Sequence, residues 1–217
     1  MLKRKHLEMI LDSLKRHPNP KIELEQYTID GKLAGDILYF AINDFYGNVV
    51  IDLGCGTGKL AIGSKLLGAK RAIGIDIDKE SIKVAKENAK KVNADVEFYC
   101  KDIREIDRQF INEKLKEDKY LKKIIIQNPP FGAQKKQADR IFVDKALEIG
   151  DVVYTIHNKP TKNFIKNYIE SKGGEITHEY EASFKIPATY SFHKKKVVNI
   201  PVIIFRIENK SKNKDND

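Results

Sequence analysis

The stretch "VVIDLGCGTGKLAIG", residues 49–63, decides the fold class of this 217-residue chain. An apolar, β-branched run is followed by Gly54, Gly56 and Gly58 and then by a segment of helix-forming residues. A strand, a tight glycine turn and a helix in this order are typical of the first unit of a ligand-binding α/β sheet, because glycines allow close backbone approach to a ligand. A plain connection between a strand and a helix is the alternative interpretation.

Outward from this stretch, short β-rich runs alternate with segments of helical spacing. The expected strands are "NVVIDL", "RAIGIDI", "DVEFYC", "KKIIIQ", "DVVYTIH", "GEITHEYEASFKI" and "VVNIPVIIFRIE". The expected helices lie near residues 3–16, 31–46, 59–68, 79–92, 104–118, 137–149 and 161–172. This alternation predicts an α/β fold with a doubly wound, mostly parallel sheet of seven strands and helices on both faces. The last two strands have no helix between them, so we expect a C-terminal antiparallel hairpin.

Length and composition favour one domain over residues 1–209, since domains usually have about 100 to 200 residues. Residues 1–30 are expected to form a helix and a segment that closes over the site. The polar end of the chain predicts a disordered tail over residues 210–217. Apolar runs fall short of the ~20 residues that a membrane helix needs, and the N-terminus lacks a signal-peptide pattern. We therefore expect a cytoplasmic protein.

The formal net charge is +9, from 40 Lys and Arg against 31 Asp and Glu. This excess favours a polyanionic partner such as nucleic acid, because positive potential attracts phosphates. The alternative is that the excess lysines lie on solvent-exposed helix faces and bind no polyanion. Cys55 and Cys100 are the only cysteines, too few for a disulfide framework or a four-ligand zinc site. Reduced thiols and no metal site are expected.

The glycine spacing is G-x-G-x-G, with Lys59 where a dinucleotide fingerprint would have its third glycine. With Asp52 ahead of it, the turn resembles the first motif of S-adenosylmethionine-dependent methyltransferases. Asp76 ends the second strand, where a carboxylate can accept hydrogen bonds from ribose hydroxyls. Asp102 ends the third strand, within reach of an adenine amino group, and Ile103 would pack on the adenine ring. A solvated strand end is the alternative for either carboxylate.

The fourth strand ends in "QNPPFG", residues 127–132. Proline fixes φ and has no backbone donor, so this loop should be stiff and present acceptors. The Asn128 side-chain oxygen and the Pro129 carbonyl can accept both hydrogens of a planar amine, and such contacts strengthen as positive charge develops on nitrogen. Pro130 stiffens the loop, and Phe131 offers a face on which an unstacked base can stack. A proline turn that only closes the strand is the alternative.

These motifs resemble a known family. "DLGCGTG" with "NPPF" resembles the amino-methyltransferases that modify adenine, cytosine or glutamine amides, and "LEQYTID", "GIDID", "NPPFG" and "IPATYSFHKKKVVNI" resemble the methyltransferase-like protein 5 family and its archaeal relatives over nearly the whole chain. The resemblance implies a Rossmann-like class I methyltransferase that makes 6-methyladenosine in small-subunit ribosomal RNA, with Asn128 to Phe131 holding the adenine. The implied S-adenosylmethionine contacts are Gln26, Tyr27, Thr28, Asp52, Gly54, Gly56, Thr57, Asp76, Ile77, Asp102, Ile103 and Asn128.

One sequence difference and one expected partner follow from the comparison with that family. Members often have a proline within "LEQYPT", which this chain lacks at "LEQYTID". Eukaryotic members work with a small zinc-binding activator subunit as a heterodimer. The family topology makes "VEFYC" an edge strand, and a bare edge would bind such a partner.

Lysines and aromatic residues gather between the last two strands, a combination suited to single-stranded RNA because lysines contact phosphates and rings contact bases. The predicted RNA-binding residues are Tyr190, Phe192, His193, Lys194, Lys195 and Lys196, with Lys135 and Lys136 after the proline loop. A solvated loop is the alternative. Arg140 would add charge near the same pocket, and His157, at the end of the fifth strand, is either a contact or a buried histidine.

Three other functions stay open. Glutamine methylation of a protein uses the same Asn-Pro-Pro loop, but its enzymes typically have tyrosine where this chain has Phe131. A DNA adenine methyltransferase would be expected to carry a large target-recognition insertion. A nucleic-acid-binding module without turnover would keep the fold, but every residue expected at the site is present.

Overall fold

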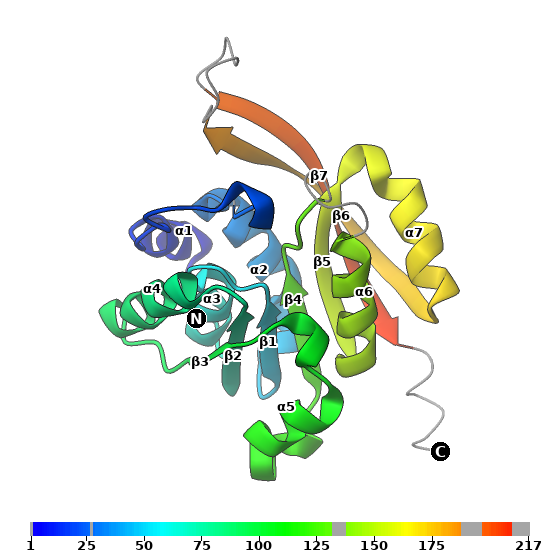
Figure 1. The fold of residues 1–217 in the computed structure, drawn as a ribbon, viewed down its shortest axis with the longest axis horizontal. Helices are drawn as coiled ribbons and strands as arrows, with labels where there is room; N and C mark the ends of the chain where they lie inside the picture. The colour runs from blue at the N-terminus through cyan, green and yellow to red at the C-terminus, as the bar shows by residue number, and fades with distance from the viewer. Residues whose placement is uncertain (1, 27, 132–137, 188–196, 210–217) are drawn as a thin grey trace.

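The computed structural model describes residues 2–26, 28–131, 138–187 and 197–209. Within these ranges, one sheet has the strand order β3-β2-β1-β4-β5-β7-β6, with helices on both faces (Figure 1). The strands are β1 (Val49–Leu53), β2 (Arg71–Asp76), β3 (Glu97–Cys100), β4 (Lys123–Gln127), β5 (Val152–Asn158), β6 (Gly174–Pro187) and β7 (Val197–Asn209). The predicted fold class is confirmed, and every strand boundary agrees with its prediction within two residues.

Strands β1 to β5 are parallel to one another, whereas β7 is antiparallel to both β5 and β6. This confirms the C-terminal hairpin. The chain runs outward from β1 through β2 to β3 and then returns to β4 on the other side of β1, so the strand order reverses between β1 and β4. Open α/β sheets bind ligands outside the carboxyl ends of the strands at such a reversal.

Two apolar cores hold the helices against the sheet. The helices are α1 (Arg4–Asp12), α2 (Gly31–Phe45), α3 (Lys59–Leu66), α4 (Lys79–Lys91), α5 (Arg108–Leu115), α6 (Ala138–Ile149) and α7 (Lys162–Ser171). Side chains of α1 to α4 share one core and side chains of α5 to α7 share the other, so these two sets cover opposite faces. Both faces of β1 and β4 are buried, which explains their unbroken apolar runs.

Aspartate side chains fix the starts of several helices. Asp30 accepts the backbone N–H of Leu33 at 2.8 Å to begin α2, and Asp107 accepts that of Phe110 at 2.7 Å to begin α5. Such N-caps satisfy donors that have no partner within the helix. The helix predicted over 104–118 is therefore too long, because Asp107 begins it late and Lys116 ends it with a φ of 53°. The first helix likewise ends at Asp12 rather than near residue 16.

The two strands of the C-terminal hairpin are longer than the others and project past the rest of the sheet (Figure 1). Strand β5 pairs with residues 202–208 of β7, whereas β6 pairs with β7 along its whole length.

Several predicted features lie outside the described residues: Tyr27, Lys135, Lys136, the set Tyr190, Phe192, His193, Lys194, Lys195 and Lys196, and the tail 210–217. The single domain over 1–209 stays a prediction. Strand β3 is an edge strand, as predicted, and none of the described helices is long and apolar enough to cross a bilayer.

Candidate active site

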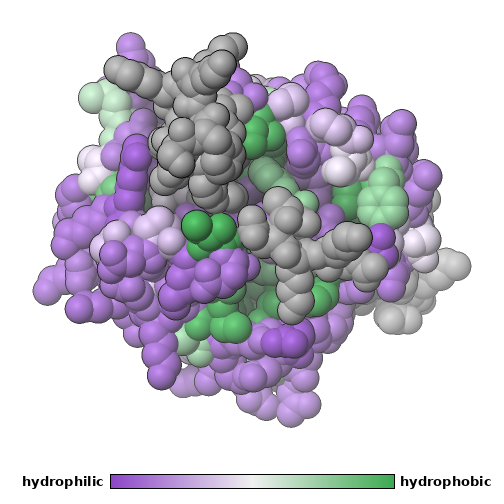
Figure 2. Space-filling view, turned by 45° about the horizontal axis from the view of Figure 1, so that its top comes forward, coloured by the Kyte–Doolittle hydropathy of each residue, from purple (hydrophilic) through white to green (hydrophobic). Residues whose placement is uncertain are grey.

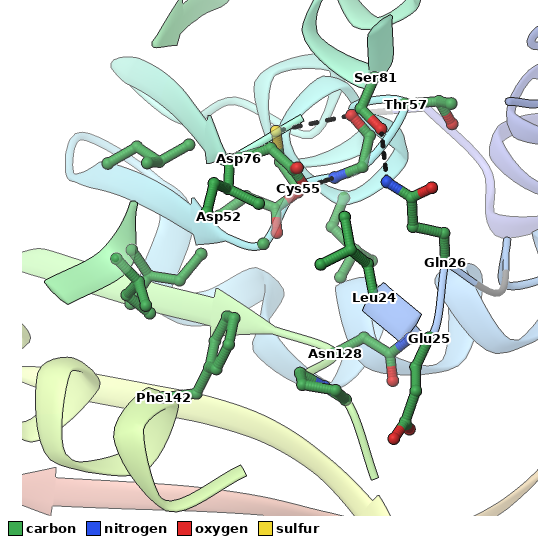
Figure 3. A pocket seen from close by; sticks show the side chains of 18 of the residues that line it. Leu24, Glu25, Gln26, Asp52, Cys55, Thr57, Asp76, Ser81, Asn128 and Phe142 are labelled. Carbon is green, nitrogen blue, oxygen red and sulfur yellow. Dashed lines mark hydrogen bonds between the residues drawn. The ribbon is translucent and has the colours of Figure 1, made fainter. Parts of the chain in front are cut away.

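A cavity of about 260 Å³ lies outside the carboxyl ends of β1, β2 and β4 (Figure 3). Its apolar lining includes Leu24, Ile77 and Ile141, which are all at least one-third exposed. Figure 2 shows a hollow with apolar residues at its floor on an otherwise mostly polar face. The predicted cofactor contacts within the described residues all line this cavity: Gln26, Thr28, Asp52, Gly54, Gly56, Thr57, Asp76, Ile77, Asp102, Ile103 and Asn128.

The glycine turn forms one wall of the cavity. Gly54, Gly56 and Gly58 have φ values of 70°, 52° and 85°, a region that side chains disfavour. The backbone N–H of Gly56 donates to Oδ2 of Asp76 at 2.8 Å, which fixes the turn to the end of β2. A Cβ built on Gly56 would meet no atom within 4 Å, whereas one on Gly54 would lie 2.8 Å from the Phe142 ring. The turn therefore leaves open space at Gly56.

Carboxylates at the ends of β2 and β3 face the same cavity. Asp76 accepts the N–H groups of Gly56 and Asp78, and burial raises its pKa. A carboxylate has about four acceptor sites, so further hydrogen bonds can be accepted. Asp102 is bound by the Arg104 guanidinium, whose Nε lies 3.0 and 3.1 Å from its two oxygens. A ligand amino group would share Asp102 with Arg104.

The loop after β4 faces the glycine turn across the cavity (Figure 3). Asn128 and Pro130 line the cavity, whereas Pro129 is buried. Oδ1 of Asn128 is buried and has no hydrogen-bond partner among the described residues. Phe131 is partly buried and packs against the core of α1 to α4, and it is not among the residues that line the cavity. Its predicted stacking on a base stays a prediction.

Comparisons with known proteins agree with this geometry. The family model for ribosomal protein L11 methyltransferase (PrmA) matches residues 42–127. The rRNA N6-adenosine-methyltransferase METTL5 of Danio rerio is 33% identical over 94% of this chain and 98% of that protein. The chain belongs to the METTL5 family.

Archaeal relatives of this METTL5-family chain are closer still. The uncharacterized protein MJ0284 of Methanocaldococcus jannaschii is 76% identical over 96% of this chain and 95% of that protein. Among solved structures, PH1948 of Pyrococcus horikoshii, proposed to be an RNA methyltransferase, is 38% identical with a TM-score of 0.83, covering 96% of this chain and 98% of that one. The resemblance inferred from the motifs is thus confirmed.

Asp78 anchors the N-terminal segment, residues 17–26 and 28–29, to the cavity of this METTL5-family protein. Its carboxylate lies 2.7 Å from Nε2 of His17, accepts from Lys21 Nζ at 2.7 Å, and accepts from Gln26 Nε2 at 3.2 Å. Burial alone would raise the pKa of Asp78, but these hydrogen bonds outweigh burial and hold the pKa well below its usual range. Asp78 was not predicted as a site residue, although its place before Ser81 at a helix start marks it as a cap.

Lys59 fastens the other end of the N-terminal segment. Its side chain is buried, and its Nζ donates to the Ile29 carbonyl at 2.7 Å. Burial lowers the pKa of Lys59. The lysine that replaces the third glycine of a dinucleotide fingerprint therefore holds the segment against α3.

Two other residues considered from the sequence, His157 and Arg140, do not line the cavity. His157 is 2% exposed and its Nε2 lies 2.9 Å from Thr155 Oγ1, and burial lowers its pKa to about 3. It is a neutral, buried histidine rather than a contact. The Arg140 guanidinium packs over the Phe164 ring at 4.7 Å.

Neither cysteine is paired, and Cys55 is buried whereas Cys100 is exposed. No group of three or more His, Cys, Asp or Glu side chains among the described residues could hold a metal ion.

Proposed function

We propose that this chain is an S-adenosylmethionine-dependent methyltransferase that modifies the N6 amine of adenosine in RNA, with small-subunit ribosomal RNA as the substrate. The observation that carries the proposal is the buried Oδ1 of Asn128, which has no partner among the described residues and lies across the cavity from Asp76. Membership of the METTL5 family supports the same reaction, since the Danio rerio relative is an rRNA N6-adenosine-methyltransferase.

The residues around the glycine turn fit S-adenosylmethionine. The open space at Gly56 allows close approach of a ligand, and Asp76 retains acceptor capacity for ribose hydroxyls. Ile77 is 51% exposed and lines the cavity together with Ile103, so the two supply apolar surface for an adenine ring. When bound, the cofactor supplies an electrophilic methyl group.

The loop after β4 would hold the acceptor. Asn128 Oδ1 and the Pro129 carbonyl can each accept one hydrogen of the exocyclic amine. These hydrogen bonds orient the nitrogen and strengthen as it becomes positive, which lowers the barrier by preorganised electrostatics. Neither acceptor needs to ionise, so positioning accounts for most of the contribution of this loop.

The family-model match does not decide between RNA and protein substrates. It ends at Gln127, one residue before the loop that would hold the acceptor. It therefore supports the donor half of the site, whereas the full-length relatives support RNA. Glutamine methylation remains the competing activity.

The test is transfer of label from S-adenosylmethionine to three polymers: transcribed small-subunit ribosomal RNA of Methanocaldococcus jannaschii, DNA of the same sequence, and a peptide-release factor. We expect label in the RNA alone, recovered as 6-methyladenosine by mass spectrometry of nucleosides. Label in the release factor would overturn the RNA assignment in favour of glutamine methylation. Label in DNA would overturn the restriction to RNA.

Two associations of this protein also remain proposals. A small zinc-binding activator subunit would bind the free edge of β3, and RNA would contact the lysines at residues 194–196. Co-expression with such a subunit, followed by size-exclusion chromatography, tests the first. A cytoplasmic location stays a prediction.

Gly56→Ala is expected to weaken S-adenosylmethionine binding by at least about tenfold while costing only about 1 kcal/mol of stability. The methyl group would enter the open space of the turn, and the positive φ disfavours a side chain. Gly173→Ala is the matched control, because Gly173 has a φ of 83° and equally open surroundings but does not line the cavity. Calorimetric titration with the cofactor checks the pair, and equal affinities would show that the turn does not contact it.

A further inference from the structure

Glu25 joins the N-terminal segment to the loop after β4. It follows the short 3-10 helix Ile22–Leu24, lines the cavity, and is 8% exposed. Its carboxylate Oε2 accepts the backbone N–H of Phe131 at 2.7 Å, across 106 residues of sequence. In Figure 3, Glu25 and Asn128 lie on the same side of the cavity, opposite Asp76.

The two prolines make the hydrogen bond of Phe131 important for the conformation of the loop. Pro129 and Pro130 have no backbone N–H, so the N–H of Phe131 is the first backbone donor after Asn128. A hydrogen bond at this point holds the stretch Asn128–Phe131 at its C-terminal end, while β4 holds it at its N-terminal end. The orientation of the Asn128 amide and the Pro129 carbonyl depends on both ends.

The backbone of Glu25 is held in an unfavourable conformation. Its φ is 48°, in the left-handed region where residues other than glycine are uncommon. Such conformations persist where the surroundings determine them, and they cluster at functional sites. Here the next residue, Gln26, donates to Asp78 at 3.2 Å and accepts from Lys21 N at 2.8 Å. The segment thus fixes where the Glu25 carboxylate lies.

We propose that Glu25 is a positioning residue for methyl transfer. It holds the Phe131 N–H, keeps the two acceptors aimed at the substrate amine, and so links the segment that covers the cofactor to the loop that holds the acceptor. This inference rests on the proposed function. A misplacement of about 1 Å can reduce a rate about 100-fold, so the hydrogen bond affects turnover rather than affinity.

Two substitutions of Glu25 separate the effect of its side-chain length from the effect of its negative charge. Glu25→Gln keeps the side-chain length and an oxygen acceptor but removes the negative charge. Glu25→Asn also keeps an amide and tolerates a positive φ, but it is one carbon shorter and does not reach Phe131. We expect Glu25→Gln to retain turnover within about threefold and Glu25→Asn to lose roughly 10- to 100-fold in kcat with little change in KM for RNA.

The experiment measures single-turnover methylation of the ribosomal RNA transcript, together with hydrogen exchange of the Phe131 amide in ¹⁵N-labelled full-length protein. We expect protection of that amide in the wild type and Glu25→Gln, and at least about tenfold faster exchange in Glu25→Asn. Equal loss of turnover in both variants would overturn the proposal, because the charge would then matter. A rise in KM alone would also overturn it.

The two proposals fail in different ways. If the wild-type protein methylates none of the three polymers, the proposed function is wrong, and the exchange rates alone decide whether Glu25 holds the loop. If the wild type methylates RNA and all three proteins exchange the Phe131 amide at the same rate, the positioning role is wrong and the function stands.

Discussion

Asn128→Ala is expected to reduce kcat for methyl transfer to RNA by about 10² to 10³-fold, the usual effect of removing one preorganised polar group from a reacting centre. Oδ1 of Asn128 is buried at the cavity wall and has no partner among the described residues. Its removal takes away an acceptor that strengthens as the amine nitrogen becomes positive. Cofactor affinity should fall much less. Single-turnover kinetics at saturating S-adenosylmethionine measures the first effect, and calorimetric titration measures the second.

Asn158→Ala is the matched control for this prediction. Asn158 ends the neighbouring strand β5, and its Oδ1 is also buried without a partner among the described residues, but it does not line the cavity. We expect its kcat to equal that of the wild type. A similar loss in both variants would mean that the effect comes from the strand ends rather than from contact with the amine. Full activity of Asn128→Ala would show that this side chain does not hold the amine, although methylation of RNA itself would stand.

Asp52 is expected to make the folded protein less stable as pH rises. Asp52 is 1% exposed, its Oδ2 accepts the N–H of Ala61 at 3.0 Å, and burial raises its pKa to about 8. In the unfolded chain its pKa would be near 3.8. Between these values the folded state keeps a proton that the unfolded state has released, so rising pH favours unfolding. The slope is about 1.4 kcal/mol per pH unit.

Asp52→Asn should remove this contribution, because the asparagine keeps an acceptor for Ala61 and does not ionise. The variant and the wild type should be similarly stable at pH 4, and the variant should gain up to about 5 kcal/mol over the wild type by pH 8. Urea unfolding at pH 4, 6 and 8 measures the difference. Stability curves that stay parallel across this range would show that Asp52 is ionised in the folded protein.

Asp44→Asn gives the opposite sign and serves as the control. Burial raises the pKa of Asp44, but hydrogen bonds from Arg206 and Tyr154 outweigh burial and lower it. Those bonds stabilise the fold above the unfolded pKa and are lost as pH falls through the folded pKa. The Asp44→Asn variant should therefore be less stable than the wild type at neutral pH, and the difference in stability should be smaller in acid.

The sheet could be predicted from sequence because its signals are local. Strands β1 and β4 are apolar runs that are buried on both faces, as in "VVIDL", and the turn after β1 carries glycines at positive φ. The residues at the carboxyl ends of β1, β2 and β4, among them Asp76 and Asn128, were expected to meet because parallel strands place those ends at one edge. The cavity contains all of the predicted cofactor contacts within the described residues.

The contacts that join distant segments could not be predicted in this way. The hydrogen bond from Phe131 to Glu25 and the contacts of Asp78 with His17 and Lys21 join residues 57 to 106 positions apart. No periodic pattern marks them, since a single polar side chain in a loop is equally consistent with solvation. The extent of α5 was also missed, because its end depends on the backbone of Lys116.

The reversal of strand order between β1 and β4 has a consequence for how such enzymes can diverge. Apart from the N-terminal segment and Asn128, the proposed contacts of the methyl donor precede Gln127 in the chain, and the proposed contacts of the acceptor follow it. A chimera joined at this peptide bond would inherit its donor chemistry from one parent and its choice of polymer from the other. Replacing the part of the chain after Gln127 would therefore change the polymer that is modified while the proposed donor contacts are kept.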